Sequence, residues 1–129
     1  MKSLIYIELT ESLTTSYEKE LITWAKATFP GLASFDLDNR SDVFMFNYAA
    51  SLAEQSDKVV VYINIHGTAS ATQFARLGEK IIANKAKSLA LMQGYNALVN
   101  RMFSLLNDNF CLGLKPEEQK KRIEDFFKD

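Results

Sequence analysis

Two sets of polar residues in this sequence have types and spacing that could do chemistry. The first is the turn at residues 66–70, which reads His-Gly-Thr-Ala-Ser and directly follows a strongly apolar segment. The second is a set of carboxylates at the ends of two other apolar segments: Glu8, Asp36 and Asp38. Because the carboxyl ends of parallel strands meet at one edge of a sheet, we expect both sets to lie at that edge.

The turn at 66–70 predicts a site for a small anion. Gly67 allows a sharp turn, and Thr68 or Ser70 could cap a following helix, whose free N–H groups favour negative charge. A phosphate or carboxylate ligand would fit there, and so would a covalent phosphate on Thr68 or Ser70. The simpler alternative is that the hydroxyl only caps the helix. The lysine and glycine spacing of a P-loop is absent.

His66 is the only histidine in the sequence. It could act as a general base, oriented by a carboxylate from Glu8, Asp36 or Asp38. The alternative is a hydrogen-bonded loop histidine with no catalytic role. One histidine and one distant cysteine, Cys111, do not make a zinc site, and no nucleophile elbow is present. We therefore assign no catalytic residue, no metal ligand and no cofactor.

Alternating apolar and amphipathic segments would position these residues. Segment 59–65 is apolar almost without interruption, which is typical of a strand covered on both faces. Further strands are expected at Leu4–Leu9, Ala33–Leu37 and Ser88–Met92, and the short apolar segment 110–114 could be an edge strand. This alternation predicts a three-layer α/β fold, with a mainly parallel sheet of about four strands and helices on both faces.

Amphipathic patterns predict the helices that connect these strands. They are expected at residues 15–28, from a cap at Ser41 or Asp42 to Gln55, at 70–86, at 96–107 and from Pro116 onward. In the helix that ends at Gln55, the four-residue spacing of Phe44, Tyr48 and Leu52 favours helical structure. In the helix at 70–86, Gly78 is expected to permit close packing against the sheet.

Length and composition predict a single domain over residues 1–129. With 47% hydrophobic and 12% aromatic residues, the chain can bury a full core. A formal net charge of -1 argues against nucleic-acid binding and gives no reason for electrostatic attachment to a membrane. The single cysteine cannot form an internal disulfide, and no apolar run reaches transmembrane length, so a cytoplasmic location is expected.

The order of elements over residues 58–129 resembles that of an anti-sigma-factor-antagonist (STAS) domain or its lipid-transfer-like relatives. The shared order is a buried strand, a polar turn, a helix, a strand ending in Gln-Gly, another helix, a short apolar step at 110–112 and a helix with an acidic start. The resemblance implies a regulatory module that binds a protein partner, with Ser70 or Thr68 as its phosphorylation switch. The family's Asp-Ser-Ser-Gly signature is replaced here by Gly-Thr-Ala-Ser.

The chain is also similar to flavodoxin-like domains, a group that includes response-regulator receivers and deoxyribosyltransferases. A receiver has an acidic residue at the end of its central strand, where this chain has Asn-Ile-His at 64–66, so receiver chemistry is not expected. A deoxyribosyltransferase-like enzyme would need a nucleophilic carboxylate at the sheet edge. The available carboxylates are Glu8, Glu11, Asp36 and Asp38.

Two classes of function follow from these observations. The leading hypothesis is a non-enzymatic interaction or regulatory module of STAS-like type, whose partner binds the turn and helix at 67–75. The alternative is a protein or enzyme that binds a nucleotide or sugar phosphate across the Gly67 turn, with His66 and a rim carboxylate near the reacting group. A third option is a homodimer through the last helix, whose Phe126 and Phe127 could dock on the same chain or on a second subunit.

Overall fold

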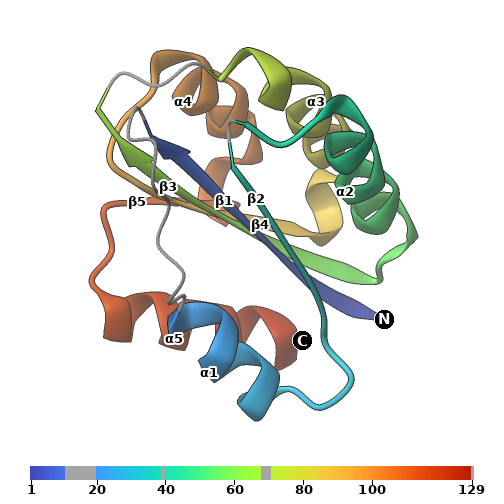
Figure 1. Cartoon of the computed structure of the whole chain (residues 1–129). Coiled ribbons are helices and arrows are strands. Elements are labelled where there is room, and N and C mark those ends of the chain that lie inside the picture. Colours follow the sequence, from blue (N-terminus) through green and yellow to red (C-terminus); the bar gives the residue numbers. More distant parts are fainter. Residues whose placement is uncertain (11–19, 39, 68–70, 129) are drawn as a thin grey trace.

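A parallel sheet of five strands lies between two layers of helices (Figure 1). The structure is a computed structural model, and it describes residues 1–10, 20–38, 40–67 and 71–128. The strands are β1 (Lys2–Thr10), β2 (Ala33–Asp38), β3 (Lys58–His66), β4 (Ser88–Gln93) and β5 (Phe110–Leu112). Their order is β2-β1-β3-β4-β5, and each neighbouring pair is parallel. The three-layer prediction is confirmed, whereas the expected number of about four strands is too low because β5 also pairs.

The helices divide between the two faces of the sheet (Figure 1). One face is covered by α1 (Glu20–Thr28) and α5 (Pro116–Lys128), and the other by α2 (Val43–Gln55), α3 (Ala75–Ala83) and α4 (Ala97–Phe103). Short 3-10 turns lie at Thr72–Phe74, Lys85–Lys87 and Ser104–Asn109. The predicted first part of the helix at 15–28 falls outside the described residues. No helix in the described ranges is both long and apolar enough to cross a membrane.

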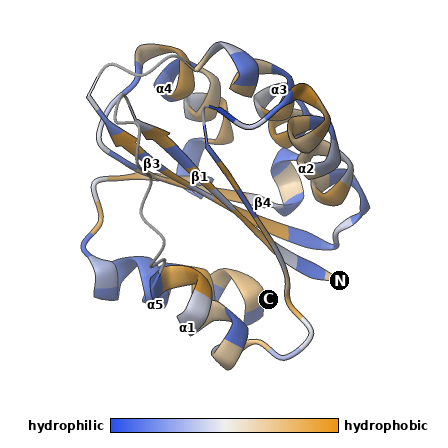
Figure 2. Cartoon of the chain, viewed as in Figure 1, coloured by the Kyte–Doolittle hydropathy of each residue, from blue (hydrophilic) through white to orange (hydrophobic). Residues whose placement is uncertain are grey.

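Two hydrophobic cores fill the space between the layers, as the hydropathy colouring in Figure 2 shows. Side chains alternate along a strand, so Ile5 and Ile7 pack with α2, α3 and α4, while Leu4 and Tyr6 pack with α1 and α5. Phe126 and Phe127 of α5 belong to this second core, so they pack on the sheet of their own chain. Burial of both sheet faces explains the uninterrupted apolar run in β3.

Of the three residues spaced by four along α2, only Leu52 packs against the core. Phe44 and Tyr48 are exposed, and the residues that face the core are Phe46, Ala49, Ala50 and Ala53. The helix begins as predicted, because the Asp42 carboxylate accepts a hydrogen bond from the Met45 N–H at 3.0 Å. The three alanines allow α2 to lie close to its neighbours, and this small-residue face is buried in place of the four-residue aromatic pattern.

The segment after β3 also differs from the prediction. Helical structure begins at Thr72 as a 3-10 turn and becomes α3 only at Ala75, and neither start has a side-chain cap. Burial of Ala71 and Phe74 in the core fixes this later start. A Cβ at Gly78 would lie 2.7 Å from Cε of Met102. Gly78 therefore permits close contact between α3 and α4, and not with the sheet as expected.

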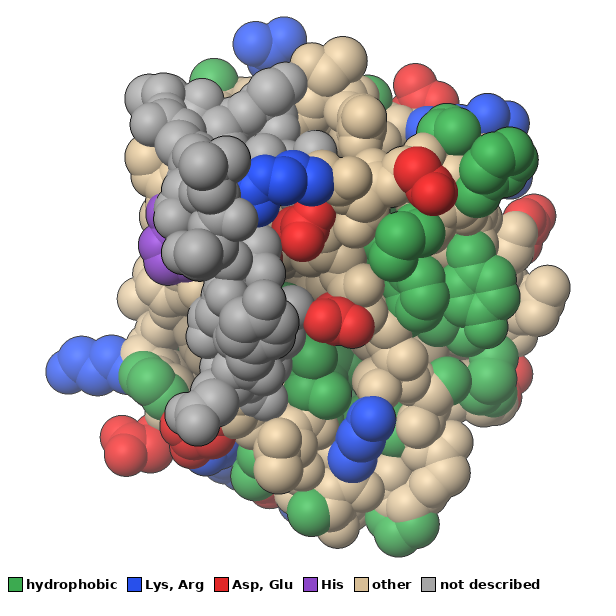
Figure 3. Space-filling model, in the orientation of Figure 1, with side chains coloured by type: hydrophobic (Ala, Val, Ile, Leu, Met, Phe, Trp, Pro, Cys, Tyr) green, Lys and Arg blue, Asp and Glu red, His purple; other side chains and the backbone are tan. Residues whose placement is uncertain are grey.

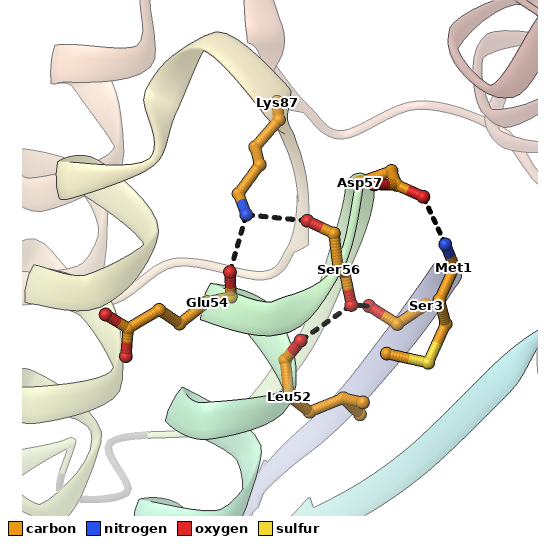
Figure 4. Close-up of polar contacts among 7 residues, drawn as sticks. All are labelled: Met1, Ser3, Leu52, Glu54, Ser56, Asp57 and Lys87. Carbon is orange, nitrogen blue, oxygen red and sulfur yellow. Dashed lines mark hydrogen bonds and ion pairs between the residues drawn. The ribbon is translucent and has the colours of Figure 1, made fainter.

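A network of hydrogen bonds holds the amino end of the sheet together (Figure 4). The buried Ser3 and Ser56 hydroxyls lie 2.8 Å apart, and the Ser56 hydroxyl donates to the Leu52 carbonyl at 2.6 Å. Since Ser56 has one hydroxyl proton, Ser3 donates to Ser56. The Lys87 ammonium donates to the carbonyls of Glu54 and Ser56 at 2.7 and 2.6 Å. These bonds join the end of α2 to β1 and to the start of β4.

Candidate functional site

The parallel register places four polar side chains in one row near the carboxyl end of the sheet. Glu8 of β1 is opposite both Asp38 of β2 and Asn64 of β3, and Asn64 is opposite Gln93 of β4. Side chains at matched positions of neighbouring strands point to the same face, about 4.8 Å apart. We call Asp38, Glu8, Asn64 and Gln93 the polar row. It lies on the face covered by α1 and α5, since Leu4 and Tyr6 of β1 point to that face.

Burial differs along the polar row. Glu8, near the middle, is only 3% exposed, whereas Asp38, Asn64 and Gln93 are half-buried. Apolar residues fill this face near the amino end of the strands, and polar residues replace them at the carboxyl end. A buried carboxylate requires hydrogen-bonding or charged neighbours, because desolvation of a charge is costly. The fold therefore places a buried acidic group beside hydrogen-bonding side chains at the sheet edge.

Two tyrosines form the next row toward the amino end. Tyr6 and Tyr62 are opposite each other in β1 and β3, and their ring centroids are 4.9 Å apart. Both are 7% exposed. The Asn64 side chain lies close enough to Tyr6, and the Gln119 side chain close enough to Tyr62, to lower the pKa of each phenol by hydrogen bonding. The tyrosine pair therefore connects the polar row to helix α5.

The environment keeps both tyrosine hydroxyls protonated. Burial raises the pKa of Tyr6, and the negative charges of Glu8 and Asp36 raise it further, against the opposing effect of the Asn64 hydrogen bond. Burial also raises the pKa of Tyr62, with a further contribution from Tyr6, against the opposing effect of the Gln119 hydrogen bond. At neutral pH both tyrosines therefore keep their hydroxyl protons.

A pocket of about 160 Å³ opens over the tyrosine pair, between the first turns of α1 and α5. Its lining residues are Tyr6, Glu20, Leu21, Tyr62, Pro116, Gln119 and Lys120. The Lys120 ammonium lies 3.2 Å from the Glu20 carboxylate, so its charge is already paired. The pocket is smaller than the roughly 300–1,000 Å³ of pockets that enclose a drug-sized ligand. It could therefore hold one ring or one short polar group of a larger molecule.

The Leu114 carbonyl ties the polar row to the start of α5. It accepts a hydrogen bond from the Gln93 amide and another from the Gln119 amide, the latter at 3.0 Å. Gln119 is also the partner of Tyr62. Residues from two strands and one helix therefore share one hydrogen-bonded arrangement.

The predicted rim carboxylates are placed at the same edge of the sheet. Glu8 and Asp38 belong to the polar row, and Asp36 is opposite Tyr6 with its side chain exposed. Asp38 also shapes its own turn, since its carboxylate accepts from the Arg40 N–H at 2.7 Å. Three carboxylates of β1 and β2 therefore lie near this edge of the sheet.

The predicted turn at 66–70 is only partly described. His66 is exposed and lies one row beyond Asn64, opposite Thr10. Gly67 has a φ of 72°, the left-handed conformation expected of glycine in a sharp turn. Thr68 and Ser70 lie outside the described residues. Helix α3 begins only at Ala75, later than the predicted start at residue 70. The N–H groups at the start of α3 therefore do not directly follow this turn.

Three residues of the site were missed from the sequence: Tyr6, Tyr62 and Gln119. The two tyrosines lie within apolar strand patterns and Gln119 lies within a charged helical pattern, so composition alone does not mark them as site residues. One signal was available. Tyr6 and Tyr62 each precede a polar residue, Glu8 or Asn64, by two positions, which places each pair on one face of its strand.

The described residues contain no group of three or more His, Cys, Asp or Glu side chains placed to hold a metal ion. No protein-family model matches the chain, and searches of curated proteins and of solved structures find no match either. The candidate site is thus defined by its own geometry: the polar row, the tyrosine pair and the pocket between α1 and α5.

Proposed function

We propose that this protein binds a small molecule rich in hydroxyl groups, such as the sugar part of a nucleoside, nucleotide or sugar phosphate. The observation that carries the proposal is the polar row, in which buried Glu8 lies between Asp38 and Asn64. Carboxylates and amide oxygens accept hydrogen bonds from sugar hydroxyls, and amide N–H groups donate to them. The two tyrosine hydroxyls lie beside the row and add polar groups to the site.

The charge of the site favours the sugar part of such a ligand over its phosphate. Glu8, Asp36 and Asp38 would repel an anion placed on the polar row. In a nucleotide or sugar phosphate, the phosphate would therefore point away from the row, toward the Gly67 turn. Of the candidate carboxylates, Glu8 is the one we place nearest the ligand.

The strand order supports a site at this position. In doubly wound sheets, ligands bind outside the carboxyl ends of the strands, where the strand order reverses. In the order β2-β1-β3-β4-β5 this point lies between β1 and β3, the strands that carry Glu8 and Asn64. An all-parallel sheet in this order is typical of flavodoxin-like domains. We therefore favour the flavodoxin-like alternative over the STAS-like one.

The test is a binding screen by thermal shift and calorimetry with the whole chain. The probes are ribonucleosides, nucleotides, free sugars, sugar phosphates and inorganic phosphate. A ligand that binds the folded state raises the melting temperature with concentration. We expect shifts from compounds that carry a sugar, and none from inorganic phosphate. A shift with phosphate alone, or none with any sugar compound, would contradict the proposal.

A pair of variants assigns the binding to the polar row. Glu8→Gln removes a charged acceptor, so we expect the dissociation constant of a sugar ligand to rise more than about tenfold. Glu79→Gln is the matched control, because Glu79 is exposed on α3, at the opposite face of the sheet. Equal effects of the two substitutions would show that the ligand binds elsewhere.

The interaction-module hypothesis is our second proposal. The described part of its predicted surface presents the polar side chains of Thr72 and Gln73, whereas Ala71 and Phe74 are buried. The phosphorylation switch at Ser70 or Thr68 stays a prediction. Ser70→Glu tests it, since a switch requires this substitution to change the affinity for a protein partner.

A further inference from the structure

The pocket over the tyrosine pair adjoins the polar row on the same face of the sheet. Tyr6 and Tyr62 line it from the sheet side, and each precedes a member of the polar row, Glu8 or Asn64, by two positions in its strand. Two residues span about 6.6 Å along a strand. A ligand whose sugar contacts the polar row can therefore place its neighbouring group in this pocket.

The lining of the pocket combines apolar surface with one buried amide. Leu21 and Pro116 lie beside the two tyrosines, and Gln119, only 5% exposed, supplies the amide. Glu20 and Lys120 also line the pocket, but their charges are paired with each other at 3.2 Å. Ligand pockets typically combine mainly apolar walls with a few polar groups that orient the ligand. This lining therefore suits an uncharged ring with a polar edge.

The Gln119 amide is held in place within this lining. Its nitrogen donates to the Leu114 carbonyl at 3.0 Å, which orients the amide without a ligand. An amide contains both donor and acceptor groups, and glutamine uses them to pair with the polar edge of adenine when proteins read DNA. An amide in the lining therefore favours a nitrogen heterocycle over a hydrocarbon ring, which offers it no hydrogen bond.

The size and position of the pocket match the base of a nucleotide. A cavity of about 150 Å³ holds one benzene ring, and this pocket has a volume of about 160 Å³. Along β3, the tyrosine pair, the polar row and the Gly67 turn follow one another, as base, sugar and phosphate do in a nucleotide. We propose that the pocket binds a nucleobase, so that the ligand is a nucleoside or nucleotide, a step that rests on the proposed binding of the sugar at the polar row.

Calorimetry with matched ligands and the whole chain tests this proposal. The four ribonucleosides are compared with methyl β-ribofuranoside, which has the same sugar and a methoxy group in place of the base. We expect at least one nucleoside to bind more than about tenfold tighter than the riboside, because a base gains contacts with aromatic side chains. Equal affinities of the riboside and all four nucleosides would overturn the base pocket and leave the sugar-binding proposal standing.

The same titrations separate failure of the base pocket from failure of the sugar site. Binding of sugar phosphates without binding of any nucleoside would overturn the base pocket alone. If none of the sugar compounds binds, the sugar-binding proposal and the base pocket are both overturned.

Nuclear Overhauser measurements locate the base without any substitution. In the complex of isotope-labelled protein with the tightest nucleoside, we expect contacts between the base protons and the ring protons of Tyr6 and Tyr62. The sugar protons should instead contact the side chains of the polar row. The reverse arrangement, with the sugar beside the tyrosines, would overturn the proposal, and so would base contacts confined to another part of the chain.

Two variants test the role of the buried amide. Gln119→Leu removes the amide at similar size, so we expect it to weaken the nucleoside more than about fivefold and to leave the riboside nearly unchanged. Equal weakening of both ligands would show a structural role and overturn the part of Gln119 in base recognition.

Phe44→Ser is the control for stacking of a base on exposed aromatic side chains. Phe44 is 78% exposed on α2, at the opposite face of the sheet. Hydrophobic side chains gather over α2 on the right of the space-filling view (Figure 3). We expect Phe44→Ser to leave nucleoside affinity unchanged. If Phe44→Ser weakens the nucleoside and Gln119→Leu does not, the base stacks on α2 and the proposal is overturned.

Discussion

The two ends of the sheet use polar side chains in different ways. At the amino end, Ser3, Ser56 and Lys87 bond to one another or to backbone carbonyls, and these bonds join the end of α2 to β1 and to the 3-10 turn before β4. At the carboxyl end, Glu8 and Asp38 place two carboxylates side by side. The first arrangement stabilises the fold. The second places two carboxylates at neighbouring positions of adjacent strands, and polar groups gathered in this way at the carboxyl edge of a parallel sheet are typical of binding sites.

The largest expected effect comes from the close contact between β3 and the end of β4. Gly94 has a φ of 77°, and a Cβ there would lie 2.1 Å from the Ile65 carbonyl oxygen. We expect Gly94→Ala to lower the free energy of unfolding by about 3 kcal/mol, through backbone strain and steric overlap. Gly31→Ala is the control for strain alone, because Gly31 has a φ of 83° and open space around it. If chemical denaturation shows that Gly94→Ala and Gly31→Ala lose the same free energy of unfolding, the steric argument is refuted.

The amino end is tested by Lys87→Met. This substitution leaves the Glu54 and Ser56 carbonyls without their charged donor, so we expect a loss of about 2 kcal/mol in the free energy of unfolding. Lys85→Met is the control: Lys85 is exposed in the same 3-10 turn, and its change should stay within about 0.5 kcal/mol. Equal free energies of unfolding for Lys87→Met and Lys85→Met in urea denaturation would show that the Lys87 hydrogen bonds do not stabilise this end of the sheet.

The carboxyl end should respond mainly through ligand binding. Glu8→Gln keeps the shape of the side chain, replaces one acceptor oxygen with an amide N–H donor and removes one of two adjacent charges. We expect affinity for a sugar ligand to fall, while the free energy of unfolding changes by less than about 1 kcal/mol. Ser56→Ala at the amino end should instead lower stability. A clear destabilisation by Glu8→Gln would remove the contrast between the two ends.

The smallest effect at neutral pH, and a distinct one in alkali, concerns the tyrosine pair. The pKa of Tyr6 and of Tyr62 is raised in the folded state, so the unfolded chain loses these protons first as pH rises. The stabilisation that the two protonated tyrosines contribute to the folded state is fully present below the unfolded pKa of about 10. It is lost as pH rises through their pKa values in the folded state. We expect Tyr6→Phe and Tyr62→Phe to flatten this alkaline loss in denaturation measured against pH. If both variants lose stability at alkaline pH as the parent chain does, the loss does not come from Tyr6 and Tyr62.

Much of the fold was predictable because apolar runs of strand length are local signals. The strand expected at 59–65 lies within β3, where burial of both faces gives an almost uninterrupted apolar run, and the strand expected at 33–37 lies within β2, which is mostly only partly buried. The phase of α2 was not predictable in this way. Both of its faces contain apolar residues, and the choice between Phe44 and Phe46 depends on close packing of alanines in three dimensions.

The candidate site was predictable only in part for a similar reason. Glu8, Asp36 and Asp38 were expected at the carboxyl edge, because any parallel sheet brings strand ends together. The row itself depends on strand order and register, which place Glu8 beside Asn64 and Tyr6 beside Tyr62. No local pattern encodes which strands are neighbours. The contribution of Gln119 depends on how α5 docks, which is also a property of the whole fold.

The two hydrogen bonds accepted by the Leu114 carbonyl connect the polar row to helix α5. Gln93 and Gln119 both donate to this carbonyl, so the row and the first turn of α5 hold the same oxygen. A ligand that takes the Gln93 amide as its own donor would withdraw one of these two bonds. The β5–α5 connection would then be held less tightly at the moment the site is filled. Occupancy of the sheet edge would thereby be transmitted to the last helix as a change in its tethering.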